Sequence, residues 1–475
     1  MSNTTTIARN TYFLFVSEIV GNMLSFFLLA LMSRHFLEIG LGKHSFALSF
    51  ASILLVFTEF GTYTYMIREI SKDKSQTQKI FSNIMGLRLV LSLGVFIVGI
   101  PIAWLMAQGL EVFLVIIITM FAVFLYYFSW NMIGVFQAYE KMQYIAIGNV
   151  VEKASAFLIG FIMIKANASL GAFVATFALS ALVYFLSMRL FFIKNIGTVN
   201  YSFDITYWKS YVKSAFPFWI SAVFISLIFK IEPFMLSLLA DYAATGWYSA
   251  SERLVLSLNF LPVIITTAVF PAMSRFHKEN KPYLRLVYEK SFRYLFVSIL
   301  PIAIGTSLLS ERIIIFIYRE SFIQSAPLLV FLIWAEVFIF LSFLSGFLLN
   351  AIDKQHIYAG VTGSVFVLMV ILNLSLIPAY KGTGAAISFL ISSCILFLIL
   401  YFFVSKEYKV KIGRIVFWPC VSGIIMTFVI LLLQALPILI IVPIAGLVYG
   451  IFLVLFRTIG KEEIDLIKAQ ILKKI

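Results

Sequence analysis

Several charged residues of this sequence stand inside long runs of apolar residues, where an ionised side chain is costly. The acids are Glu18, Glu59, Glu232, Glu252 and Glu336, and the bases are Lys153, Lys230 and Arg253. Placing such a group at the centre of a membrane-spanning helix costs roughly 2.5–3.5 kcal/mol on insertion scales, so it usually faces a partner or a water-filled passage. The bases could bind an anion, and the acids could bind protons or metal cations.

The first two acids, Glu18 and Glu59, are predicted to share one site. They stand about equally far before and after a turn expected near residue 39, which places them at similar depth. Two carboxylates in one site repel each other, and this favours a shared proton or a bound sodium ion. The alternative interpretation is polar packing between helices rich in small residues.

A second group is predicted around a turn near residue 242. Glu232 and Glu252 are expected at equal depth, with Lys230 and Arg253 beside them. One interpretation is a structural salt bridge, either Glu232 to Arg253 or Lys230 to Glu252. The other is that a cation here faces a cavity and holds a phosphate group, since arginine binds phosphate through two parallel hydrogen bonds and lysine binds it as a point charge.

Lys153 is the strongest single candidate for an anion contact, because it lies near the middle of its apolar run. An ion pair with Glu152 is predicted to be poor, since adjacent side chains diverge on a helix. Glu336 is the last deep charge and has no predicted partner. Arg34 is predicted to stand at the outer mouth of a passage, although ordinary loop solvation would also explain it.

The amino-acid composition indicates which kind of secondary structure contains these charged residues. Of the 475 residues, 62% are hydrophobic and 12% are charged, whereas soluble domains carry about 25% charged residues. The apolar runs are continuous rather than alternating, which favours membrane-spanning helices over a β-barrel. The two cysteines lie in apolar runs and form no disulfide or zinc pattern. The sequence predicts neither a metal nor a cofactor.

We expect an all-α membrane protein with about fourteen spanning helices, each of roughly 20 apolar residues. The first apolar run is too long for a cleaved signal peptide and contains Glu18, so it is predicted to be the first spanning helix. The predicted helices cover 11–33, 45–67, 88–108, 112–135, 143–165, 169–193, 213–239, 246–271, 291–310, 325–350, 356–378, 383–405, 415–433 and 436–456.

The basic residues test this arrangement. With the N-terminus inside, most of the 36 lysines and arginines fall in loops on one side, as the positive-inside rule requires. Both termini are therefore predicted to be cytoplasmic. The net charge of +14 reflects this topology rather than nucleic-acid binding. The end of the chain, from about Lys461 to Ile475, has an amphipathic pattern that could lie on the anionic leaflet or be solvated.

The two halves of the sequence resemble each other at offsets of about 200 residues, and this predicts a parallel repeat of two six-helix lobes. The matching pairs are Ala138–Lys141 with Ala351–Lys354, Pro101 with Pro301, and Ser45–Ala47 with Tyr248–Ala250. The predicted parts are an N-lobe at 1–193, a cytoplasmic linker at 194–212, a C-lobe at 213–405, a helix pair at 406–456 and a cytoplasmic tail at 457–475. Two lobes related by an axis along the membrane normal are typical of transporters.

Several short motifs carry a resemblance to a known family. They are Glu59–Gly61 with Ile67–Ile70, Lys230–Glu232 with Gly246–Ala250, Phe270–Arg275, and the two loops that end in Lys141 and Lys354. In this order they resemble the multidrug/oligosaccharidyl-lipid/polysaccharide exporter superfamily, and within it the polysaccharide exporters that include O-antigen and capsule repeat-unit flippases.

The resemblance implies a two-lobed transporter with alternating access in the bacterial inner membrane. Its expected substrate is an undecaprenyl-diphosphate-linked oligosaccharide, with H⁺ or Na⁺ as coupling ion. Its other expected partners are membrane lipids, a polysaccharide polymerase and a chain-length regulator. The extra helix pair favours the polysaccharide exporters or the lipid II flippases over drug exporters, which typically have twelve helices.

Two other functions stay open as alternatives. A drug/cation antiporter would have a small cavity dominated by acids. A membrane enzyme, such as a polysaccharide polymerase, would need a large outer loop bearing acids or histidines. The longest predicted outer loop, about 311–324, has no histidine, no nucleophile stands at catalytic spacing from a base, and there is no phosphate-binding loop. We therefore expect a transporter rather than an enzyme.

Overall fold

The computed structural model describes residues 3–410, 412–456 and 458, and within these residues every regular element is helical. The chain divides into two compact units, residues 1–249 and 250–475, which are described separately. The predicted amphipathic segment 461–475 lies outside the described residues. The all-helical fold class is confirmed within the described part of the chain.

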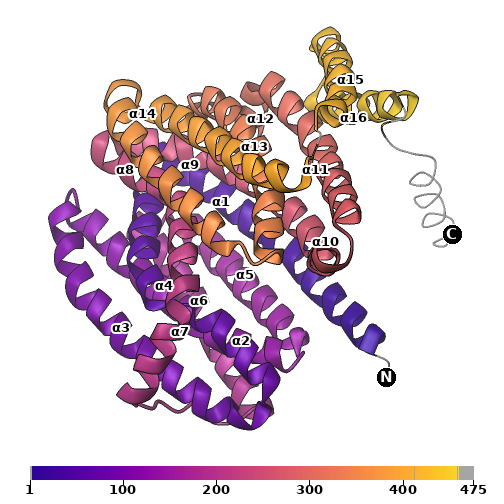
Figure 1. The fold of residues 1–475 in the computed structure, drawn as a ribbon. Coiled ribbons are helices and arrows are strands. Elements are labelled where there is room, and N and C mark those ends of the chain that lie inside the picture. The colour runs from indigo at the N-terminus through magenta and orange to yellow at the C-terminus, as the bar shows by residue number, and fades with distance from the viewer. Residues whose placement is uncertain (1–2, 411, 457, 459–475) are drawn as a thin grey trace. The chain divides into compact units, whose positions relative to one another are not determined.

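Unit 1 begins with a long helix, α1, in which two helices meet at Leu37, whose φ is 55°. Figure 1 shows α4, α5 and α6 beside one another, and both α4 and α5 pack against α1. The elements of this unit are α1 (Asn3–Leu55), η1 (Val56–Thr58), α2 (Thr62–Lys72), η2 (Lys74–Gln76), α3 (Thr77–Met106), α4 (Leu110–Ala138), α5 (Met142–Lys165), α6 (Leu170–Asn195), α7 (Ile205–Ile228), α8 (Ile231–Leu239) and the start of α9 (Tyr242–Leu256).

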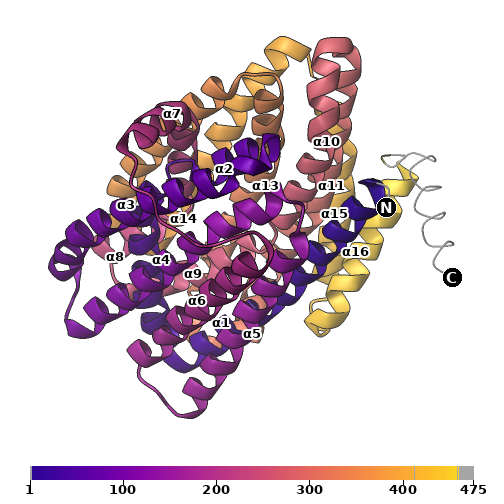
Figure 2. The same ribbon diagram turned by 90° about the horizontal axis from the view of Figure 1, so that it is seen from below.

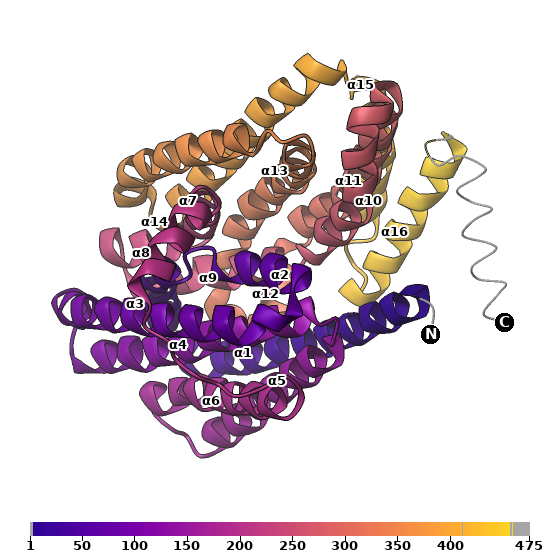
Figure 3. The ribbon, with the colours of Figure 1, turned by 60° about the horizontal axis from the view of Figure 1, so that its bottom comes forward.

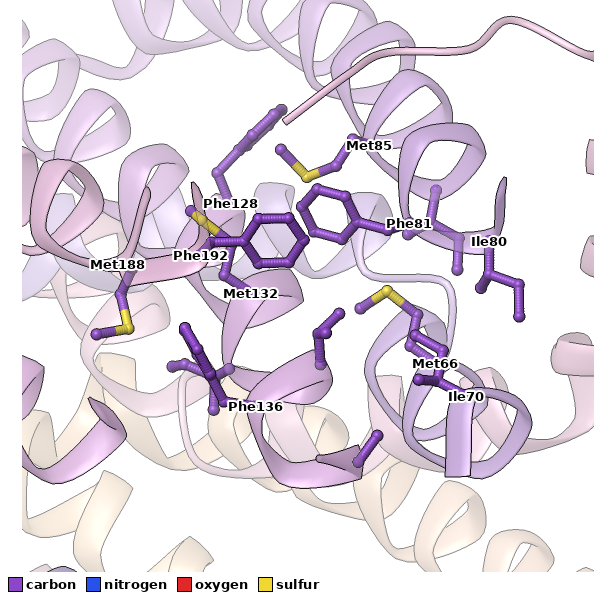
Figure 4. Close-up of a cluster of buried hydrophobic side chains, with 14 of the residues drawn as sticks. Met66, Ile70, Ile80, Phe81, Met85, Phe128, Met132, Phe136, Met188 and Phe192 are labelled. Carbon is purple, nitrogen blue, oxygen red and sulfur yellow. The ribbon is translucent and has the colours of Figure 1, made fainter. Parts of the chain in front are cut away.

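The core of unit 1 is a cluster of phenylalanine and methionine side chains from α2, α3, α4 and α6 (Figure 4). Phe81 and Phe192 stack with their ring centroids 4.3 Å apart, and Met66 and Met132 are fully buried beside them. Lipid is as apolar as these side chains, so van der Waals packing rather than the exclusion of water holds such helices together. Methionine suits this role because its flexible, polarisable chain fills irregular gaps.

Unit 2 contains a second long helix, α14, in which two helices meet at Lys381, whose φ is 48°. Helix α13 packs against α14 and α11 (Figure 3), while α15 packs against α11 and α16 (Figure 2). The elements are α10 (Phe260–Glu279), α11 (Lys281–Leu308), α12 (Ser310–Tyr318), η3 (Glu320–Phe322), α13 (Ser325–Ala351), α14 (Gln355–Tyr408), α15 (Gly413–Leu432) and α16 (Ile438–Leu455).

Ten helical segments of the described chain are long and apolar enough to span a membrane. Two of them, α14 and the span that includes most of α1, each join two helices at a kink. The chain is therefore a multi-pass membrane protein, while the count of about fourteen spans stays a prediction. Helix α3 begins well before the expected residue 88, and α7 begins at Ile205, so part of the expected linker 194–212 is helical.

Two predicted helices are wrong because each is interrupted. The helix expected at 213–239 ends at Ile228 and restarts at Ile231, and the helix expected at 246–271 breaks at residues 257–259. Pro233 and Pro262 stand in the first turn after each break. A proline ring collides with the carbonyl group four residues before it, so a proline favours a break and is best placed in the first turn of a helix. It does not force a break in this chain, because Pro101 and Pro301 lie inside the helices α3 and α11.

The helix expected at 45–67 is also interrupted, at residues 56–61, where Phe60 and Gly61 have positive φ. The guanidinium of the fully buried Arg88 donates to the carbonyl groups of Thr58 and Tyr127 and to Thr62 Oγ1. The Tyr211 hydroxyl donates to the Phe60 carbonyl over 2.6 Å. The bonds to Thr58 and Phe60 give partners to carbonyl groups at the break, where the regular helical pattern stops.

The chain crosses itself at two glycines of unit 1. A Cβ added to Gly42 would stand 1.8 Å from the carbonyl oxygen of Tyr242, and one added to Gly246 would stand 1.9 Å from the carbonyl oxygen of Glu38. No side chain fits at either position, because backbone rather than a flexible side chain occupies the space. Gly246 belongs to one of the sequence motifs given above, and the crossing explains why that motif needs glycine.

We expect Gly42→Ala and Gly246→Ala each to destabilise the protein by about 2 kcal/mol or more, the upper part of the range for overpacked interiors. Gly94→Ala is the matched control, because a Cβ at Gly94 meets nothing within 4 Å. Thermal unfolding and the monodisperse yield in detergent measure the effect. Unchanged stability of both crossing variants would contradict the close approach.

Candidate functional site

Lys153 lies on the side of α5 that faces away from lipid. The exposed apolar side chains of Ile147, Leu158 and Ile162 define the opposite side of this helix. At 100° per residue, Lys153 and Asn149 stand about half a turn from them. The Lys153 side chain is half-buried, and a Cβ added to Gly21 of α1 would stand 3.3 Å from Lys153 Cγ. The lysine stem therefore lies against α1 inside unit 1.

The ion pair between Lys153 and Glu152, predicted to be poor, is present. Lys153 Nζ lies 3.1 Å from Glu152 Oε1, and Glu152 is buried. The Cβ atoms of adjacent residues do diverge, but both side chains are long enough to fold back. The low polarity of the surroundings strengthens the attraction between opposite charges and favours the pair over exposure of either charge.

Aromatic side chains of α4 and α6 lie beside this ion pair. The ring of Tyr126 stacks on Tyr184 at 5.5 Å and stands edge-on to Trp130 at 5.9 Å. The Tyr184 hydroxyl donates to Asn149 Oδ1 over 3.0 Å. Electrostatic interactions join Tyr126 to Lys153 and Glu152. We call these six residues the Lys153 cluster: Tyr126, Trp130, Asn149, Glu152, Lys153 and Tyr184.

The orientation of α4 supports an interior position for the cluster. Its exposed side chains Leu110, Leu114 and Phe121 share one side of the helix. Tyr126 and Trp130 lie about 140–180° from that side by helical periodicity, and both rings are partly accessible. The cluster thus combines a cation, an acid, an amide and partly accessible aromatic rings on faces turned away from lipid.

The structure places Glu18 and Glu59 with different cations. Glu18 interacts electrostatically with Lys153, whereas Glu59 interacts with Arg88. The Glu59 carboxylate accepts hydrogen bonds from the amides of Gly61 and Tyr63, at 2.9 and 3.2 Å. It therefore caps the start of α2. The proposed shared proton or sodium site between the two acids stays a prediction.

The remaining candidates of unit 1 lie at helix ends and kinks. Lys230 is the second of the two residues between α7 and α8, and Glu232 is fully buried in the first turn of α8. Both residues therefore stand at the interruption of the helix expected at 213–239. Arg34 is half-buried just before the kink at Leu37.

In unit 2, Arg253 interacts electrostatically with Glu252 and Tyr318. The Tyr318 hydroxyl donates to the Ala250 carbonyl over 3.2 Å, which fixes the ring near the arginine. Glu336 of α13 is fully buried, and neither carboxyl oxygen has a hydrogen-bond partner within the described chain. Burying a carboxyl group in this way is costly, so Glu336 is the acid of unit 2 most in need of a proton or a cation.

Two buried polar residues were not identified from the sequence. Arg88 stands at the first residue of the helix expected at 88–108, whereas α3 begins at Thr77 and buries this arginine within the helix. The polar atoms of Asn373, in α14, are buried and have no hydrogen-bond partner in the described structure. The sequence feature that could have identified this residue is an asparagine within an apolar run. No group of three or more histidine, cysteine or acidic residues in the described chain could hold a metal.

Known proteins resemble this chain in sequence family and in fold. A family model described as "Polysaccharide biosynthesis protein" matches residues 7–277. No curated protein sequence matches the chain. The fold resembles the lipid II flippase MurJ in its inward closed conformation, with a TM-score of 0.79 and 19% identity over 93% of this chain and 98% of that one.

The fold also resembles a multidrug resistance MATE family transporter of the MOP superfamily. The inward-facing form aligns with a TM-score of 0.65 and 14% identity over 80% of this chain and 94% of that one. The outward-facing form aligns with a TM-score of 0.59 and 14% identity over 85% and 95%. At these identities the likeness concerns the fold, while the family match covers more than half of the sequence. The chain therefore belongs to the polysaccharide biosynthesis protein family and has the fold of MOP-superfamily transporters.

Proposed function

We propose that this protein moves an undecaprenyl-diphosphate-linked oligosaccharide across the inner membrane for synthesis of O-antigen or capsule. Its family membership supports a role in making polysaccharide, and its fold is shared with a protein described as a lipid II flippase. The observation that carries the proposal is the Lys153 cluster, which joins a cation to aromatic rings on faces turned away from lipid. Both termini are cytoplasmic in this proposal.

The chemistry of the cluster suits the two polar parts of such a substrate. Lys153 provides the positive charge for a diphosphate group. The partly accessible rings of Tyr126 and Trp130 can stack against the apolar face of a sugar. Without substrate, Glu152 neutralises Lys153 at 3.1 Å, which lowers the cost of keeping a cation in the membrane interior. In the same proposal Lys230, Arg253 and Arg34 are further anion contacts along the route.

Alternating access requires two lobes that rock against each other, and two observations support a repeated architecture. The crossing at the glycines is reciprocal, because Gly42 approaches Tyr242 and Gly246 approaches Glu38. Gly246 follows Gly42 by 204 positions in the sequence, and Tyr242 follows Glu38 by the same 204 positions. A pseudo-twofold axis between repeats would produce this pattern. The loops at Glu140 and Asp353 also share a positive φ, 57° and 59°, and the same pattern of backbone hydrogen bonds.

We also propose that an ion gradient drives transport through one or more buried acids. Glu336 is the leading candidate, because its carboxyl oxygens are buried without a hydrogen-bond partner among the described residues. Glu18, Glu59, Glu232 and Glu252 are the other candidates. The second candidate function is lipid II flipping, which is favoured by the fold match to MurJ. A drug/cation antiporter is supported only by the weaker match to MATE transporters.

Deleting the gene in its native host tests the substrate class. We expect loss of surface polysaccharide together with accumulation of carrier-linked repeat units on the cytoplasmic side, measured by glycan gels and lipid extraction. A lipid II flippase would instead cause accumulation of peptidoglycan precursor and cell lysis. Increased drug sensitivity with normal surface glycan would favour the antiporter and overturn the proposal.

Substitution of Lys153 tests the anion contact. Lys153→Gln is expected to lower flipping at least tenfold, because a hydrogen bond to a charged group contributes about 1.5–3 kcal/mol. Lys153→Arg should restore part of the activity. The matched control is Lys165→Gln, an exposed lysine in the last turn of the same helix. Complementation of the deletion strain, normalised to protein in the membrane, measures the effect, and full complementation by Lys153→Gln would remove Lys153 from the substrate site.

Substitution of Glu336 tests ion coupling. Glu336→Gln nearly preserves shape and removes the titrating group, so we expect folded protein whose flipping no longer responds to a proton or sodium gradient. Flux of a short-chain lipid-diphosphate sugar in proteoliposomes measures the response, with Glu320→Gln, an exposed acid of η3, as the control. An unchanged response of the Glu336 variant to both gradients would exclude this residue as the coupling acid.

A further inference from the structure

A pocket of about 440 Å³ lies in unit 2, where α11 begins and α14 ends. Its charged lining consists of Lys281, Arg285 and Glu289 from α11, and Glu407 and Lys409 from the end of α14. The pocket is separate from the Lys153 cluster, which belongs to unit 1. It lies at the ends of two helices that contain spanning segments, which places it at the membrane surface.

The charges of the pocket do not balance. Both of its acids are paired, Glu289 with Arg285 at 2.8 Å and Glu407 with Lys354. Lys281 and Lys409 have no hydrogen bond or ion pair to another side chain among the described residues. Together with the paired bases, these two lysines leave a net positive charge on a concave surface. Such a surface attracts an anion.

The geometry of the pocket positions Lys409 in an unusual way. Its φ of 51° and ψ of 42° are left-handed, and its amide donates to the Ser405 carbonyl to end α14. Glycine is the usual residue in this position, because a side chain costs energy there. This conformation ends α14 and sets the direction in which the chain leaves the helix at the pocket wall.

Two further features shape an anion site. Asn280 accepts a hydrogen bond from the amide of Tyr283 and so caps α11, whose N-terminal end carries a partial positive charge. Tyr408, which also lines the pocket, is fixed by a 2.8 Å hydrogen bond between its hydroxyl and His277 Nδ1. The Tyr408 ring and the exposed side chain of Leu286 add an apolar edge beside the cations.

We propose that this pocket binds a phosphate group, with Lys281 and Lys409 as the two lysines that contact it. An anionic phospholipid headgroup fits the combination of cations and apolar edge at the membrane surface, and a free phosphate ion shares the same chemistry. The pocket lining shares no residue with the proposed anion contacts Lys153, Lys230, Arg253 and Arg34, so the test of this site does not depend on which substrate the protein transports.

The test uses the purified full-length protein in a phosphate-free detergent. Native mass spectrometry measures binding of phosphatidylglycerol, with diacylglycerol as the lipid lacking phosphate and inorganic phosphate as competitor. The test variant is Lys281→Gln with Lys409→Gln. The control variant is Lys290→Gln with Lys406→Gln, which removes the same charge from exposed lysines of the same two helices outside the pocket lining.

We expect the test variant to bind phosphatidylglycerol on the order of tenfold more weakly, while the control variant binds within twofold of the unchanged protein. Displacement of the lipid by millimolar inorganic phosphate would show that a free phosphate ion also occupies the site. Absence of displacement would assign the site to the lipid headgroup. Equal binding by the two double variants, or equal binding of diacylglycerol, would overturn the proposal.

Discussion

In lipid, every backbone polar group needs a partner inside the protein, and this constraint explains the arrangement around the interruption at residues 56–61. Arg88 and Tyr211 bond the carbonyl groups there, and Glu59 accepts from the amides of Gly61 and Tyr63. The buried Arg88 therefore has a structural role that does not involve a substrate. The Glu59 carboxylate is already occupied by two amides, so any role in ion coupling would have to compete with its capping role.

The same constraint explains the two similar loops that end in Lys141 and Lys354. In each loop the lysine amide bonds the carbonyl group five residues earlier, Lys141 to Phe136 and Lys354 to Leu349. The preceding acid adopts the positive φ that this tight helix end requires. The Lys141 side chain donates to the Asn195 carbonyl at the end of α6. The Lys354 side chain donates to the Glu407 carboxylate near the end of α14. These features account for the motif through helix termination and anchoring, independently of any substrate.

Apolar length was enough to predict α4, α5, α6 and α13, because their ends lie within a few residues of the predicted ones. The interruptions before Pro233 and Pro262 were missed, because proline alone does not identify a break: Pro101 and Pro301 lie inside continuous helices. For the site, the sequence predicted that Lys153 lies deep in the membrane but not that Tyr126 and Tyr184 lie near it. That proximity depends on the rotation and axial register of packed helices, which hydropathy does not contain.

The Lys153–Glu152 pair suits a binding site that must also release its substrate. At 3.1 Å and an effective dielectric constant near 20, the attraction is about 5 kcal/mol before the cost of desolvation. A diphosphate carries more negative charge than one carboxylate, so in the proposed function it can replace Glu152 as the partner of Lys153. The displaced carboxylate then needs a proton or a sugar hydroxyl as a new partner. When the acid returns to the lysine, the anion loses its contact, so an adjacent acid allows a buried cation to bind a charged lipid without trapping it.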